Sequence, residues 1–91
     1  MAKGDVVLAR ASGGQPIVRR VWEVESGQIL VTLEDYYKRW QNQKVAPWTF
    51  GLEKTNVFKH DAKLFEQLEA AFHAKHKDQL DKLWAQAKHY T

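Results

Sequence analysis

The spacing of the apolar residues changes once along this 91-residue chain, near residue 60, and this change limits the folds available to it. Before that point, apolar residues come in short alternating or β-branched runs, which are typical of β-strands. After it, they recur at intervals of three and four, which is typical of helices that bury one face. We therefore expect a strand-rich part over residues 1–59 and a helical part over residues 60–91.

The strand-rich part holds about five short segments with strand character. Ile17–Glu25 and Gln28–Leu33 flank the dipeptide Ser26-Gly27, which predicts a β-hairpin. The first of these segments alternates, with Val18, Arg20, Trp22 and Val24 on one side and Ile17, Arg19, Val21, Glu23 and Glu25 on the other. Further strands are expected at Asp5–Arg10, Trp48–Phe50 and Asn56–Lys59, with Gly51–Thr55 as the turn between the last two. The segment Tyr36–Gln43 fits a widened strand, a helical turn or an exposed loop.

Two helices are expected after residue 60. Asp61 can cap the first, whose apolar face is Leu64, Phe65, Leu68, Ala71 and Phe72. Asp78 can cap the second, whose apolar face is Leu80, Leu83, Trp84 and Ala87. Neither helix is long enough to be stable alone, so both should pack on each other and on the strands. The pattern predicts one α+β domain over residues 1–91, in which the strands form a small closed barrel or a strongly bent sheet.

Two short motifs add a family resemblance. Gly4-Asp5-Val6-Val7-Leu8-Ala9-Arg10 resembles the opening strand of SH3-like small barrels of the Tudor and PWWP group. Val57-Phe58-Lys59-His60-Asp61, followed by Leu83-Trp84, is similar to the transition from barrel to helices in PWWP domains. The resemblance implies an SH3-like β-barrel of about five short strands with two C-terminal α-helices packed on it. It also implies binding of nucleic acid through basic residues and of methylated lysine through an aromatic cage. Gln15-Pro16-Ile17-Val18 stands where that group has Pro-Trp-Trp-Pro, so the cage residue of that motif has no counterpart here.

The composition narrows the class of protein. Cysteine is absent, which excludes disulfides and thiolate chemistry. No apolar run approaches the roughly 20 residues that a membrane span needs, and Met1–Asp5 has no signal-peptide core. Apolar residues at 44% and charged residues at 27% are an ordinary globular balance. We expect a soluble, cytoplasmic protein that does not associate with membranes.

The positive charge and the aromatic residues are concentrated together. Residues 1–59 hold nine Lys and Arg against six Asp and Glu, whereas residues 60–91 hold five of each sign. Five large aromatics fall within residues 36–50. Aromatic rings can stack on bases while neighbouring cations contact phosphates, so the pattern favours a nucleic-acid-binding module.

The candidate site residues follow from this clustering. The phosphate-contacting candidates are Arg10, Arg19, Arg20, Lys38, Arg39 and Lys44, and the stacking candidates are Tyr36, Tyr37, Trp40 and Trp48. The competing interpretation is structural: the cations would be solvated or paired with Glu23, Glu25 or Glu34, and the aromatics would close the barrel. Trp22 and Trp84 lie on apolar faces and are expected in the core.

A protein-interaction module or homodimer is the alternative function, because aromatics and Arg are also enriched at protein interfaces. An unpaired barrel edge near Tyr36–Gln43 could then accept a strand from a partner.

Catalysis and metal binding have little support in the sequence. Ser12 and Ser26 lie in glycine-flanked turns, and Gly13-Gly14 lacks the Lys-Ser/Thr ending of a phosphate-binding loop. His73 and His76 could share a helix face, but no His-Glu-x-x-His pattern accompanies them. We therefore expect no enzymatic activity, no metal and no cofactor.

Overall fold

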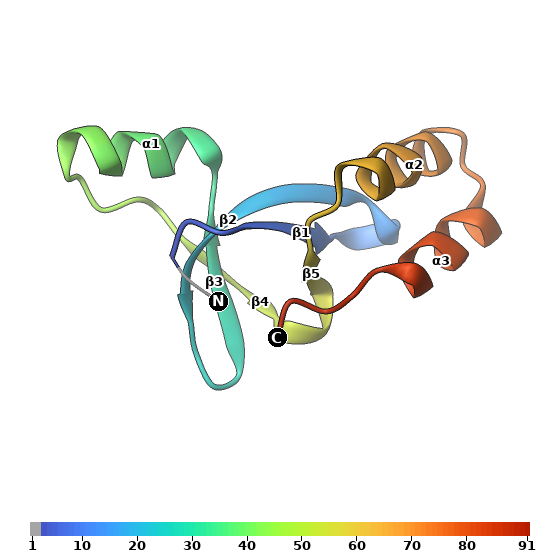
Figure 1. The fold of residues 1–91 in the computed structure, drawn as a ribbon, viewed down its shortest axis with the longest axis horizontal. Coiled ribbons are helices and arrows are strands. Elements are labelled where there is room, and N and C mark those ends of the chain that lie inside the picture. The colour runs from blue at the N-terminus through green and yellow to red at the C-terminus, as the bar shows by residue number, and fades with distance from the viewer. Residues whose placement is uncertain (1–2) are drawn as a thin grey trace.

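The chain folds into one antiparallel sheet with helices at both ends of the molecule, as a computed structural model that describes residues 3–91 shows (Figure 1). The α+β class is confirmed, and so are the two helices after residue 60. The elements in chain order are β1 (Val6–Arg10), the 3₁₀ turn η1 (Ser12–Gly14), β2 (Pro16–Val24), β3 (Gln28–Thr32), α1 (Glu34–Gln43), β4 (Phe50–Glu53), the 3₁₀ turn η2 (Lys54–Asn56), β5 (Val57–Lys59), α2 (Ala62–His73) and α3 (Lys77–Gln86).

The sheet is open, with the strand order β4-β3-β2-β1-β5. The predicted hairpin is confirmed: β2 pairs with β3, and Glu25 N–H donates to the Gln28 carbonyl across the turn. The expected closure into a barrel is not seen in the described part of the chain, where β4 and β5 form the two edges. The C-terminal residues cover the β5 edge, since Lys59 N–H donates to Lys88 O and Tyr90 N–H donates to Val57 O.

A β-bulge at Trp22 breaks the predicted alternation of β2. Val21 lies opposite Val31, but Glu23 already lies opposite Leu30, so Trp22 is the additional residue. The bulge allows both Val21 and Val24 to pack in one core cluster, although simple alternation places them on opposite faces. Trp22 itself is only half-buried and lies outside the core clusters, so the prediction that it is a core residue is wrong.

Two core clusters lie on the two faces of β1 and β5. One combines Leu8 and Phe58 with α2 and α3, and the other combines Val7 and Val57 with β2 and β3. Neighbouring residues of a strand point to opposite faces, so β1 and β5 each contribute side chains to both clusters. The predicted apolar faces of both C-terminal helices are confirmed. Their buried members are Leu68, Ala71, Leu80, Leu83 and Trp84.

The helix caps are confirmed for α2 and wrong for α3. Asp61 accepts a hydrogen bond from Leu64 N–H at 3.0 Å, as expected for the residue that caps α2. α3 begins at Lys77 with His76 as its cap, because Lys75 turns the chain in a left-handed conformation, with φ of 59°. Asp78 therefore lies in the first turn, where the helix dipole favours a negative charge.

The ambiguous segment at residues 36–43 forms most of α1. Glu34 and Asp35 occupy its first turn, where acidic residues are favourable, and Lys44 ends it in a left-handed conformation with φ of 58°. The molecule measures 42 Å along its longest axis, and α1 lies at the opposite end from α2 and α3 (Figure 1). The predicted unpaired strand edge at Tyr36–Gln43 is therefore wrong, and β4 is the edge strand instead.

The strand predicted at Trp48–Phe50 begins only at Phe50, and the predicted turn at Gly51–Thr55 is also displaced. Gly51 belongs to β4, and the turn is η2. With no side chain of its own, Gly51 leaves room for the end of the exposed Gln28 side chain, which lies across it. None of the helices among the described residues has both the length and the apolar character needed to cross a bilayer.

Candidate functional site

The structure divides the ten candidate residues among three places. Six of them lie on α1 or just after it, namely Tyr36, Tyr37, Lys38, Arg39, Trp40 and Lys44, and Trp48 lies in the loop before β4. Arg19 and Arg20 lie on β2. Arg10 lies at the end of β1, next to η2 and α3. The ten candidate residues therefore do not form one continuous surface.

Arg20 joins β2 to the first turn of α1. Its Nε and Nη2 donate to the two carboxylate oxygens of Glu34, and its Nη1 donates to the Gly4 carbonyl at 2.6 Å. The hydrogen bond from Arg20 lowers the pKa of Glu34, and the same bond raises the pKa of Arg20. Three directed hydrogen bonds commit this guanidinium to the fold, so it is a poor candidate for a phosphate contact.

Tyr37 and Trp40 hold α1 against the sheet. Tyr37 is 8% exposed, and its ring lies 5.5 Å from that of Trp40. Trp40 also makes an edge contact with Trp22, with ring centroids 4.9 Å apart. Gly4, with φ of 95°, approaches so closely that a Cβ there would lie 2.3 Å from the Tyr37 hydroxyl. These two aromatics therefore serve mainly to dock α1.

Arg19 lies against a different part of the sheet. Its guanidinium is 5.8 Å from the Phe50 ring, and Nη1 donates to the Val18 carbonyl at 2.9 Å. Burial lowers the pKa of Arg19 because the charged form loses hydration.

The remaining candidates border a small pocket between α1 and the loop that leads to β4. We call its lining the α1–β4 surface: Tyr36, Arg39, Val45, Ala46, Pro47 and Trp48, around a volume of about 230 Å³. Trp48 is 65% exposed and Val45 is 51% exposed, and these are the exposed large apolar side chains of the described chain. Exposed apolar groups that lie together on a monomer often mark a binding site.

The local structure explains how the loop presents Trp48. Lys44 has already ended α1 in a left-handed conformation, and Pro47 favours an extended conformation at Ala46. The buried Thr32 hydroxyl donates to the Trp48 carbonyl at 2.8 Å and fixes the loop beside β3. The indole packs at a tilt on Phe50, with ring centroids 5.2 Å apart, and is otherwise mostly in solvent.

One cation, Arg39, lines this pocket, and two further cations lie on α1 or directly after it. Arg39 is exposed, and its guanidinium lies 5.9 Å from the Tyr36 ring. Lys38 and Lys44 are also exposed, and the Lys38 ammonium is 3.9 Å from a Glu34 oxygen. The sequence pattern did not predict that Val45, Ala46 and Pro47 belong to the site. The available signal was Pro47 itself, because a proline directly before Trp48 indicates a loop at this point of the chain.

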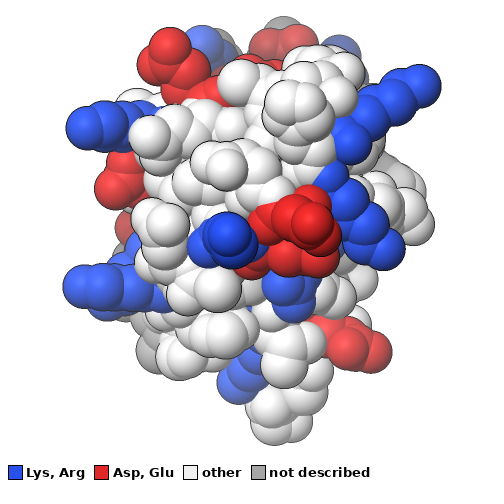
Figure 2. Space-filling model, turned by 90° about the vertical axis from the view of Figure 1, so that its right-hand side faces the viewer, with Lys and Arg blue, Asp and Glu red and all other residues white. Residues whose placement is uncertain are grey.

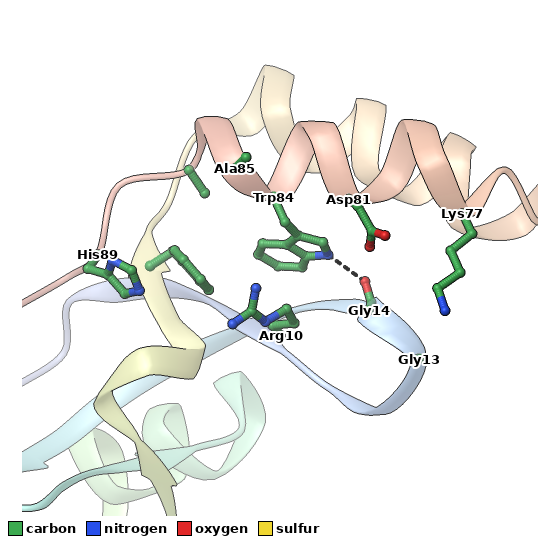
Figure 3. Close-up of a pocket in the computed structure, with 10 residues that line it drawn as sticks. Arg10, Gly13, Gly14, Lys77, Asp81, Trp84, Ala85 and His89 are labelled. Carbon is green, nitrogen blue, oxygen red and sulfur yellow. Dashed lines mark hydrogen bonds between the residues drawn. The ribbon is translucent and has the colours of Figure 1, made fainter.

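Arg10 lies in a second cavity at the helical end of the molecule (Figure 3). Its Nε and Nη2 donate to Asn56 Oδ1, both at 3.2 Å, and Nη2 also donates to Thr55 O at 3.3 Å. The guanidinium lies 5.1 Å from the Phe58 ring and 5.6 Å from the Trp84 ring. Trp84 is 4% exposed, so its predicted place in the core is confirmed.

The described residues contain no group of three His, Cys, Asp or Glu side chains placed to hold a metal ion. No protein-family model, curated protein or solved structure matches the chain.

Proposed function

We propose that this chain is a nucleic-acid-binding module that holds an unpaired base against Trp48 on the α1–β4 surface. The observation that carries the proposal is the 65% exposure of Trp48 beside Tyr36 and Arg39, which line the same pocket. An exposed indole is a stacking platform for any base, and each stacked base contributes roughly 1–3 kcal/mol.

The surrounding charges support an anionic ligand. Lys38, Arg39 and Lys44 are exposed at this end of the molecule. Asp35 is exposed on the same helix, and Lys/Arg and Asp/Glu side chains are interspersed at the end formed by α2 and α3 as well (Figure 2). A base on Trp48 would bring its own phosphates near Arg39. Bases within a duplex are stacked on one another, so we expect single strands to bind better than duplexes.

A protein partner or homodimer is the second candidate, and one observation favours it. β4 is an edge strand that starts two residues after Trp48, and β3 is its only strand partner among the described residues. A strand from another chain could pair with this edge while its side chains cover Val45 and Trp48. Such binding would depend little on salt.

We also propose that the sheet is an opened form of an SH3-like barrel of the Tudor and PWWP type. The strand order β4-β3-β2-β1-β5 and the two helices that follow β5 support this relationship. In this proposal the chain is a single non-enzymatic domain that works in the cytoplasm.

The test is a fluorescence anisotropy titration of a labelled mixed-sequence single strand and its duplex at two salt concentrations. We expect the single strand to bind more tightly than the duplex. The logarithm of its binding constant should fall linearly with the logarithm of the salt concentration, with a slope of about −0.7 for each phosphate that the protein neutralises. Arg39→Gln should weaken binding and reduce that slope, whereas Lys63→Gln, which changes an exposed cation on α2, should change neither. Absence of binding at low salt contradicts the proposal, and binding that does not change with salt favours a partner of another class.

A further inference from the structure

A cavity of about 590 Å³ lies between the β1–β2 turn and α3, at the opposite end from the α1–β4 surface (Figure 3). This volume is within the range of about 300–1,000 Å³ typical of small-molecule sites. Its inner wall is fixed, because the Trp84 indole N–H donates to Gly14 O at 2.7 Å and holds the turn against the helix. Gly14 is required for this approach, since a Cβ there would lie 2.8 Å from Leu80.

Arg10 presents a positioned cation to this cavity. Asn56 and Thr55 accept from its Nε and Nη2, so the orientation of the guanidinium is set. Among residues 3–91, no hydrogen-bond acceptor is found for Nη1. A cation whose geometry is already fixed loses little entropy when it binds an anion.

Two charged side chains of α3 also line the cavity. Lys77 and Asp81 are one helical turn apart, and both extend from α3 toward the β1–β2 turn (Figure 3). Neither takes part in a salt bridge within the described residues, where Glu34 accepts both salt bridges. With Arg10, the cavity therefore offers two cations and one carboxylate.

His89 forms the wall nearest the C-terminus. Its ring stacks on Phe58, with centroids 4.7 Å apart, and Phe58 and His89 form a β-bridge. The imidazole remains exposed, so it can contact a planar ligand.

We propose that this cavity binds a small planar molecule that carries a phosphate group and an amino group, which is the chemistry of a nucleoside monophosphate. The phosphate accepts from Arg10 Nη1 and Lys77 Nζ, Asp81 accepts from the amino group, and the planar body lies against His89. A free nucleotide and the 5′-phosphorylated end of a strand share this chemistry. The inference uses no residue of the α1–β4 surface and does not depend on the function proposed for it.

The test is an NMR titration of the ¹⁵N-labelled protein with AMP, with adenosine as the uncharged control. AMP should shift the signals of the Trp84 indole N–H and the Arg10 Nε–H. Adenosine should bind at least about tenfold more weakly, the loss expected for charge-assisted hydrogen bonds. Lys77→Gln should weaken AMP binding several-fold, by about 3–10 times. Lys82→Gln should not, because this exposed residue of α3 lies outside the cavity.

Equal binding of AMP and adenosine, equal effects of the two Lys variants, or no shift at millimolar AMP would each overturn the inference. A 5′-phosphorylated trinucleotide and its unphosphorylated form distinguish the two sources. Shifts with free AMP assign the site to nucleotides, and shifts with the phosphorylated trinucleotide alone assign it to strand ends. Shifts around Trp48 without shifts around Trp84 overturn this inference while supporting the function proposed above.

Discussion

Trp84 and Arg10 at the helical end contrast with Trp48 and Arg39 at the α1 end. Trp84 is 4% exposed and donates to Gly14 O, and Arg10 is hydrogen-bonded to Asn56. Trp48 is 65% exposed, and Arg39 lies over the ring of Tyr36. The same two residue types are therefore part of the fold at one end and open to solvent at the other. Residue type alone does not distinguish these roles; contacts between distant parts of the chain do.

The packing at each end explains the difference. At the helical end, α2 and α3 bring two apolar faces onto Leu8 and Phe58, so Trp84 becomes enclosed. At the other end, α1 docks through Tyr37 and Trp40, and Trp48 lies beyond it in the loop between α1 and β4. Trp48 is left in solvent although its carbonyl is anchored by Thr32.

The largest expected effect is on stability at the helical end. Trp84→Ala removes a buried indole from the core and should lower the free energy of unfolding by about 3–5 kcal/mol. Trp48→Ala is the matched control and should change it by less than about 0.5 kcal/mol. Urea denaturation followed by circular dichroism measures both. Similar losses in the two variants would remove the contrast between the two ends.

The β1–β2 turn gives the next largest effect. Gly14 has φ of 83° and no room for a Cβ, so Gly14→Ala should destabilise the fold by about 1–3 kcal/mol. Gly27→Ala is the control, because nothing lies within 4 Å of a Cβ at that position in the hairpin turn. Thermal unfolding of both variants tests this, and an unaffected Gly14→Ala protein would show that the turn is not held against α3.

A smaller effect is expected where Arg20 holds α1. Glu34 is partly exposed, so Glu34→Gln should lower the free energy of unfolding at neutral pH by no more than about 1 kcal/mol. The pKa of Glu34 is lowered in the folded chain. The stabilisation is therefore complete above the pKa of glutamate in the unfolded chain and is lost as the pH falls through the lowered value. The difference between wild type and variant should disappear in acid, and a difference that grows on acidification would contradict this role.

Regular patterns predicted the regular parts of the fold. The Ser26-Gly27 hairpin and the apolar faces of α2 and α3 follow from local spacing, which the structure retains. The bulge at Trp22 does not, because it depends on how β2 pairs with β3. α1 was only one of three possibilities, since the docking of Tyr37 on Gly4 and of Arg20 on Glu34 joins distant residues.

The candidate site was also predicted only in part, because contacts between distant residues are not visible in local patterns. Clustering of aromatics and cations grouped Tyr36, Arg39 and Trp48 as candidates, and these three line one pocket. It could not separate them from Arg20 and Tyr37, because the contacts that commit those two to the fold come from Glu34 and Gly4. Val45 carries no charge or ring and gave no signal of its own.

The most direct test of the account is to measure stability and single-strand affinity together for Trp48→Ala and Trp48→Phe. We expect Trp48→Ala to keep its stability and to lose about 5- to 150-fold in affinity, while Trp48→Phe retains much of the binding because it keeps an aromatic face. A Trp48→Ala protein that binds as tightly as wild type, or that loses binding only because it unfolds, would contradict the assignment of Trp48 to a binding surface.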